Sequence, residues 1–92
     1  MQINIRHAEM KRREDGSYLG SAHLEVSGHK TPYEVILHSE DGKDWGFAVH
    51  FLHSSGPEEE ITALEAFIEE NDDAFARLVE AAMDTMESDR EN

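Results

Sequence analysis

The fold is decided by residues 33–51, which read YEVILHSEDGKDWGFAVHF. Apolar side chains alternate with other residues on both sides of the turn signal Asp41-Gly42, a pattern typical of two half-buried antiparallel strands. A five-residue loop over 40–44 places Val35 opposite Val49 and keeps the apolar side chains on one face. A two-residue loop would mix the two faces, so the five-residue loop is predicted.

The same alternation continues toward the N-terminus, interrupted by the turn signals Gly28-His29 and Asp15-Gly16. Two-residue loops are predicted at both, of type II′ and type I′ respectively, because glycine tolerates the backbone angles that these turns require. A two-residue loop at Asp15-Gly16 pairs Ile5 with Val26 and His7 with Leu24. The predicted sheet is a four-stranded antiparallel meander with strands at about 2–13, 18–27, 30–39 and 44–53.

These registers bring the large apolar side chains of all four strands to one face, which is the predicted core. Gly20 and Ala22 are small residues in the middle of that face and leave space for a segment lying across it. The predicted core residues of the sheet are Ile3, Ile5, Leu24, Val26, Tyr33, Val35, Leu37, Trp45, Phe47, Val49 and Phe51.

Apolar residues recur at helical spacing after Pro57, which suits the first position of a helix because its missing N–H is no loss there. The like charges around Asn71 favour a break, with Asn71 in the left-handed conformation and Asp72 or Asp73 capping a second helix. Helices are therefore predicted at about 57–70 and 73–88. The sequence predicts an α+β fold of ββββαα order, in which both helices pack on the apolar sheet face.

A single domain over 1–92 is expected, because 92 residues leave room for one compact core. It comprises the antiparallel sheet of 1–53, an acidic helical pair over 54–88 and a frayed tail at 89–92. Residues 1–53 contain six basic and eight acidic side chains, whereas 54–92 contain two basic and thirteen acidic ones. The charge of −13 is therefore concentrated in the helical part.

Composition excludes several function classes. The chain contains no cysteine, which excludes disulfides, cysteine-ligated zinc, iron–sulfur clusters and thiol nucleophiles. Its acidity, with a pI near 4.6, argues against direct nucleic-acid binding through a basic surface. No apolar leader and no bilayer-length apolar run is visible, so a cytoplasmic protein without membrane contact is expected. Neither a P-loop, a nucleophile elbow, a metalloprotease motif nor a dinucleotide fingerprint occurs, so neither a catalytic site nor a cofactor is predicted.

One row of polar side chains on the outer face of the sheet is a candidate metal-binding site. The registers place His23 opposite Glu34 and Glu34 opposite His50, with Ala8 completing the row on the first strand. A carboxylate flanked by two imidazoles is a ligand set for a divalent metal or a proton-sensitive cluster. The alternative is an exposed polar row in which Glu34 offsets two partly charged imidazoles. Arg6 and Glu25 are a further predicted cross-strand pair on this face.

Two surfaces are candidates for binding a protein partner. The first is the outward face of the two helices, which either keeps a small protein soluble or docks a basic partner, with nucleic-acid mimicry as a special case. The second is an apolar strip on the outer sheet face, which is either scattered exposed surface or a partner or dimer contact. The predicted partner-binding residues are Glu58, Glu65, Glu69, Glu80, Asp84 and Glu87 on the helices and Met10 and Ile36 on the sheet.

The sequence thus favours a small non-enzymatic interaction or regulatory domain that docks a basic protein through its acidic helices or its outer sheet face. The second hypothesis is a protein that binds a metal or small ligand through His23, Glu34 and His50. An enzyme with a pocket near Tyr33, Trp45 and His7 ranks third, because those residues are more simply explained as core or periphery. A monomer or a weak homodimer is expected.

Overall fold

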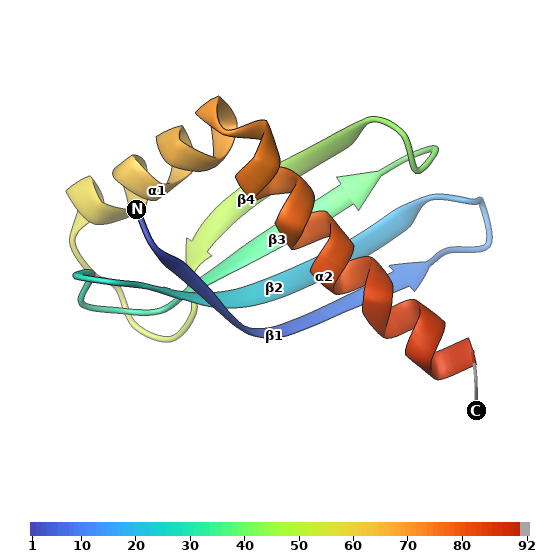
Figure 1. Ribbon diagram of the computed structural model, residues 1–92, viewed down its shortest axis with the longest axis horizontal. Coiled ribbons are helices and arrows are strands. Elements are labelled where there is room, and N and C mark those ends of the chain that lie inside the picture. The colour runs from blue at the N-terminus through green and yellow to red at the C-terminus, as the bar shows by residue number, and fades with distance from the viewer. Residues whose placement is uncertain (91–92) are drawn as a thin grey trace.

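The computed structural model describes the backbone of residues 1–90 and the side chains of residues 1–86. Four antiparallel strands form one open sheet in chain order, and two helices follow. This confirms the predicted α+β arrangement (Figure 1). The elements are β1 (Ile3–Arg12), β2 (Tyr18–Val26), β3 (Tyr33–Ser39), β4 (Trp45–Phe51), α1 (Glu58–Glu70) and α2 (Asp72–Arg90).

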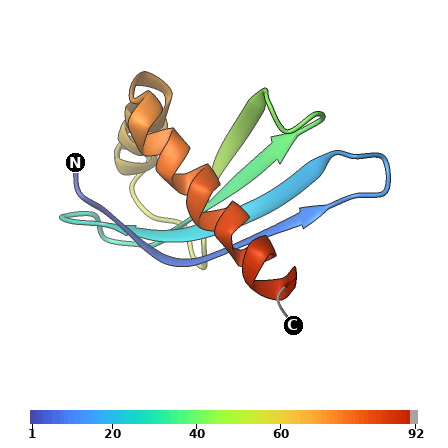
Figure 2. The same cartoon turned by 45° about the vertical axis from the view of Figure 1, so that its right-hand side comes forward.

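The two helices lie over the same face of the sheet, and Figures 1 and 2 show this from two directions. α1 packs beside β4, whereas α2 crosses the sheet diagonally and packs mainly on β1. The molecule therefore has two layers. One face of the sheet is covered by helices, and over residues 1–90 no helix or strand covers the other face.

The core lies between the sheet and the helices and joins them into one cluster of buried side chains. Tyr33, Leu24 and Leu37 from the sheet and Leu64 and Leu78 from the helices are fully buried. The other predicted sheet residues are buried or pack against this cluster, which confirms the predicted inward face of β2, β3 and β4.

The β2–β3 and β3–β4 registers are those predicted. Leu24 pairs with Tyr33 across the second hairpin, and Val35 pairs with Val49 across the third. The second turn itself differs, because the His29 amide donates to the Val26 carbonyl at 3.0 Å and Gly28 takes the third position with φ 88°. Positive φ at the third position is the geometry of a type II turn, so the predicted type II′ turn is wrong although its register is right.

The β1–β2 register was predicted incorrectly, because the first hairpin has a three-residue loop. The Arg13 amide donates to the Ser17 carbonyl at 2.8 Å, and the Gly16 amide donates to the Arg13 carbonyl at 3.0 Å. Gly16 has φ 90°, as expected for a type I turn followed by one left-handed residue. Asp15 supports this loop, since its Oδ1 accepts hydrogen bonds from the Ser17 amide at 2.9 Å and the Ser17 hydroxyl at 2.6 Å.

The longer loop shifts β1 by one residue and exchanges its two faces near the hairpin. Met10 pairs with Gly20 and is buried at 5% exposure, although it was predicted on the outer face. A Cβ atom added to Gly20 would lie 2.7 Å from Met10 Sδ, so the Met10 side chain occupies the space above this glycine. Ala8 also faces inward, opposite Ala22.

A β-bulge between Ile5 and His7 then restores the predicted orientation for the first residues of β1. Ile5 pairs with Leu24, and Ile3 pairs with Val26, so both isoleucines face the core. A bulge places two residues of one strand opposite one residue of its partner, which reverses the alternation beyond it. His7 lies on the hairpin side of the bulge, where the three-residue loop places it on the outer face opposite His23, so its predicted pairing with Leu24 is wrong.

Asn71 separates the two helices, and neither helix end has the predicted cap. Pro57 is the N-cap of α1, with φ −64° and ψ 126°, and so precedes the first helical residue. Asn71 is extended at φ −120° and ψ 94°, not left-handed. Its side-chain amide donates to the Phe67 carbonyl at 2.9 Å, and its own carbonyl accepts the Phe75 amide at 3.1 Å. One residue thus ends α1 and begins α2.

The second helix is longer than predicted, since its backbone continues to Arg90. Of the expected frayed tail, residues 91–92 lie outside the described residues. Over the described part of the chain, neither helix combines the length and apolar character that crossing a bilayer requires.

Candidate functional site

The outer face of the sheet carries a row of polar side chains that crosses all four strands. The register pairs His23 with Glu34 and Glu34 with His50, which places these three residues side by side as predicted. The side chains of His23 and Glu34 are 32% and 33% exposed, so both are partly shielded by their neighbours.

The fourth member of this row is His7, and the prediction of Ala8 is corrected. The three-residue first loop shifts β1 so that His7 pairs with His23 on the outer face, and the two imidazole centroids lie 5.2 Å apart. The signal that sequence reasoning missed is the Asp15-Gly16-Ser17 segment. Its aspartate accepts two hydrogen bonds from the following serine and thereby favours the three-residue loop.

One close polar contact holds the row together. His23 Nε2 lies 3.3 Å from Glu34 Oε2, whereas His7 Nε2 faces Glu9 Oε2 at 3.9 Å. As the side chains of the described residues stand, no three carboxylate or imidazole groups converge on one point that would hold a metal. His50 shares the row but makes no hydrogen bond to Glu34 among the described contacts.

The outer face also carries a short apolar strip beside the polar row. Ile36 pairs with Ala48, and Leu19 on the neighbouring strand is 40% exposed. Met10 was predicted to belong to this strip, but the first hairpin places its side chain against Gly20 in the core. The strip is therefore smaller than predicted, with Ile36 as its partly buried centre.

Acidic side chains cover the outward surface of both helices. Glu58, Glu65 and Glu69 of α1 and Glu80 and Asp84 of α2 are all exposed, as predicted, while the side chain of Glu87 lies outside the described residues. Between Glu58 and Met86, ten carboxylate side chains are accompanied by a single basic one, Arg77. No ion pair within 4.0 Å joins any of these groups to a described side chain, since the three ion pairs found among residues 1–86 all lie in the sheet.

One of these carboxylates has a structural role that the sequence did not indicate. Glu60 Oε1 accepts a hydrogen bond from the Lys30 amide at 2.9 Å and so ties the β2–β3 connection to the start of α1. Nearby, the Tyr33 hydroxyl lies 2.8 Å from His29 Nδ1. Burial, and secondly the charge of Glu60, raise the pKa of Tyr33 above its ordinary value. These contacts fix the β2–β3 connection against the start of α1.

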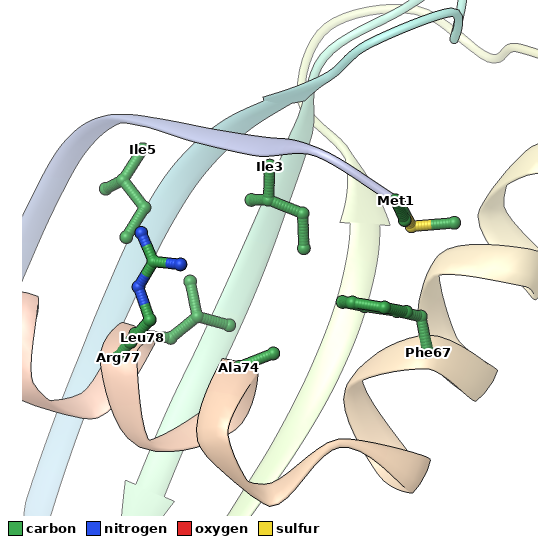
Figure 3. Close-up of a pocket in the computed structure, with 7 residues that line it drawn as sticks. All are labelled: Met1, Ile3, Ile5, Phe67, Ala74, Arg77 and Leu78. Atoms are coloured by element: carbon green, nitrogen blue, oxygen red, sulfur yellow. The ribbon is translucent and has the colours of Figure 1, made fainter.

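A small cavity opens between β1 and the two helices. Its walls are the apolar side chains of Ile3, Ile5, Phe67 and Leu78, and the Arg77 guanidinium extends from α2 toward Ile5 across it (Figure 3). The cavity measures about 70 Å³, which is far below the roughly 300–1,000 Å³ of a site for a drug-sized ligand or cofactor. The long stem of arginine commonly covers apolar surface in this way, so we assign the arrangement to packing.

The outer sheet face and the acidic helical surface are thus the two candidate sites, and they lie on opposite sides of the molecule (Figures 1 and 2). The predicted Arg6–Glu25 ion pair is confirmed at 3.2 Å on the sheet side. Comparison of the chain with protein-family models, curated proteins and solved structures finds no significant match.

Proposed function

We propose that this protein is a non-enzymatic interaction domain that docks a basic protein partner through the outward surface of α1 and α2. The observation that carries the proposal is the concentration of ten carboxylates with one arginine between Glu58 and Met86. None of the ten forms an ion pair with a described side chain. Apart from Glu60, whose Oε1 accepts a hydrogen bond from the Lys30 amide, these carboxylates are available to lysine and arginine side chains of another protein.

The physical advantage of such a surface is mainly kinetic. Electrostatic attraction raises association rates above the roughly 10⁵–10⁶ M⁻¹s⁻¹ of neutral surfaces, and salt screens it with a Debye length of about 8 Å at physiological ionic strength. The same field repels the phosphates of nucleic acids and of anionic membranes, so the proposed partner is a protein. Mimicry of a nucleic acid is a special case of this proposal, in which the basic partner itself binds phosphates.

A cytoplasmic setting and a regulatory role without catalysis or a bound cofactor belong to the same proposal. The absence of cysteine suits a reducing compartment, where disulfides contribute little to small proteins. The apolar strip around Ile36 and Ala48 supports a second contact surface on the opposite side. Because that strip is small, it suits a weak homodimer better than a stable one.

The experiment compares two variants that each lose three negative charges. In the helix variant, Glu65, Glu69 and Glu80 are replaced by glutamine. In the control variant, Glu14→Gln, Glu40→Gln and Asp44→Asn remove the same charge from exposed loops of the sheet. Proteins captured from a cytosolic extract at low salt are identified, purified and titrated against the wild type and both variants at several salt concentrations.

The proposal expects a purified basic partner whose affinity falls steadily with salt. It also expects the helix variant to bind at least tenfold more weakly than the control variant, because the lost charges lie in the contact. Equal losses in the two variants would show that only net charge matters and would contradict a docking surface on the helices. A partner whose affinity is independent of salt contradicts the proposal as well.

A further inference from the structure

The polar row on the outer sheet face places three metal-ligating side chains on adjacent strands. His7 of β1 pairs with His23 of β2, and His23 pairs with Glu34 of β3. Directly paired side chains of antiparallel strands have Cβ atoms about 4.5–5.5 Å apart, which is within reach of one common ion. Two histidines and one glutamate are also a ligand set that zinc uses in proteins.

Two of the separations in this row match those of a tetrahedral site. Two imidazoles that share a tetrahedral zinc have ring centroids about 5 Å apart, because each Zn–N bond is about 2.0–2.1 Å and the nitrogen lies about 1.1 Å from the ring centre. The centroids of His7 and His23 lie 5.2 Å apart. Two ligand atoms of such a site are about 3.3 Å apart by the same geometry, and His23 Nε2 lies 3.3 Å from Glu34 Oε2.

The distance between His23 and Glu34 is also long for a hydrogen bond. Hydrogen bonds between nitrogen and oxygen are usually about 2.9–3.0 Å long, and charged ones are shorter. At 3.3 Å, His23 and Glu34 are held close to each other by the sheet without forming a short hydrogen bond. Strand pairing places the two side chains next to each other, and their two atoms already lie at the separation that a shared tetrahedral ion requires.

One side chain has to move to complete the site. His7 Nε2 faces Glu9 Oε2 at 3.9 Å, so the three groups do not converge as they stand. The His7 side chain is 57% exposed, and 3.9 Å is too long for a hydrogen bond. Rotation of His7 toward His23 therefore breaks no strong contact and displaces no core residue.

We propose that His7, His23 and Glu34 form a binding site for a zinc-like divalent metal on the open face of the sheet, with a fourth position left to water. Imidazole nitrogen selects zinc, nickel and copper over magnesium and calcium, which prefer oxygen ligands. The net charge of −13 raises the concentration of cations around the whole molecule. Binding weakens on acidification, because metal ligation requires neutral imidazoles.

The test is zinc titration of the full chain in excess magnesium, which occupies the acidic helices without competing for imidazole nitrogen. Calorimetry gives the affinity, and ¹⁵N-correlated spectra of the imidazoles identify the histidines that bind. His7→Gln, His23→Gln and Glu34→Gln remove one ligand each. His53→Gln is the matched control, because His53 is an exposed histidine outside the sheet. Far-UV circular dichroism checks that every variant is folded.

The expected result is saturable binding of one zinc ion with shifts of His7 and His23. Each of the three ligand variants is expected to bind at least tenfold more weakly, since even supporting residues around metal sites contribute tenfold or more. The His53 variant is expected to bind like the wild type. Absence of saturable binding in magnesium overturns the proposal, as does full affinity in the His7 variant. A tenfold loss in His50→Gln with the His7 variant unaffected would assign the metal to His23, Glu34 and His50 instead.

Discussion

Replacement of Met10 by alanine tests the register of β1 directly. Met10 is 5% exposed and fills the space above Gly20, with its Sδ atom 2.7 Å from the position that a Gly20 Cβ would take. Truncation of a buried methionine to alanine typically costs about 2–5 kcal/mol, from lost burial and from the cavity left behind. We expect about 2–3 kcal/mol, because β1 is an edge strand on which α2 can partly close the gap.

The assay is urea unfolding followed by far-UV circular dichroism. With a slope of about 1 kcal/mol per molar urea for a chain of this size, the expected loss lowers the midpoint by roughly 2–3 M. The melting temperature falls by roughly 10–20 °C. Met10→Leu conserves volume and is expected to cost less than about 1.5 kcal/mol. Leu19→Ala removes a 40% exposed side chain from the other face of the sheet, and we expect a loss below about 1 kcal/mol.

The refuting result is a Met10→Ala variant within about 0.5 kcal/mol of the wild type, which is the usual range for exposed positions. That outcome would place Met10 on the open face, and with it a two-residue first turn. His7 would then leave the row with His23 and Glu34, so the proposed metal site would lose one of its ligands.

Three further predictions concern Gly16 and Asp41 in the loops and Tyr33 in β3. Gly16→Ala is expected to lower the free energy of unfolding by about 1–2 kcal/mol, because φ is 90° and no neighbouring atom adds a clash; Gly16→Asn should cost less in the same urea assay. Backbone hydrogen bonds from Asp44 and Lys43 lower the pKa of Asp41 below 3.8, so its contribution to stability is present above about pH 4 and is lost as the pH falls through the lowered pKa. The stability difference between wild type and Asp41→Ala should therefore narrow in acid, and a constant difference down to about pH 2.5 would contradict this. Burial raises the pKa of Tyr33 above 10.0, so alkaline titration by tyrosinate absorbance should show a late component that Tyr33→Phe lacks, and the stability due to Tyr33 should decline as the pH rises past 10.0.

Much of the sheet could be predicted because burial on one face constrains strand pairing. A slip of one residue against either neighbour would bring polar side chains onto the face of Tyr33, Val35 and Leu37, and both predicted registers are confirmed. The β1–β2 pairing was harder, because Asp15-Gly16 is compatible with a loop of two or three residues. A β-bulge between Ile5 and His7 also interrupts the alternation of inward and outward side chains along β1. The apolar residues of β1 alone do not indicate where such a bulge lies. The helices were predictable to within a few residues from apolar spacing, while the caps at Pro57 and Asn71 were not.

The candidate sites were predicted correctly where the strand registers were correct, and incorrectly on β1. The row of His23, Glu34 and His50 depended on the two registers that were predicted correctly. The errors at Met10 and His7 both come from the first hairpin, where a shift of one residue exchanges the two faces. Exposure of the acidic helical residues could be predicted from spacing alone, because the apolar stripe of each helix leaves the opposite side to solvent.

The single residue between the two helices bears on how the acidic surface meets a partner. Asn71 binds the last turn of α1 through its side chain and the first turn of α2 through its carbonyl, so no flexible connection separates them. The spacing between the two sets of carboxylates is consequently a property of the free protein. An incoming molecule does not have to immobilise one helix against the other, and the entropy normally lost in ordering a binding surface is largely lost already when the chain folds.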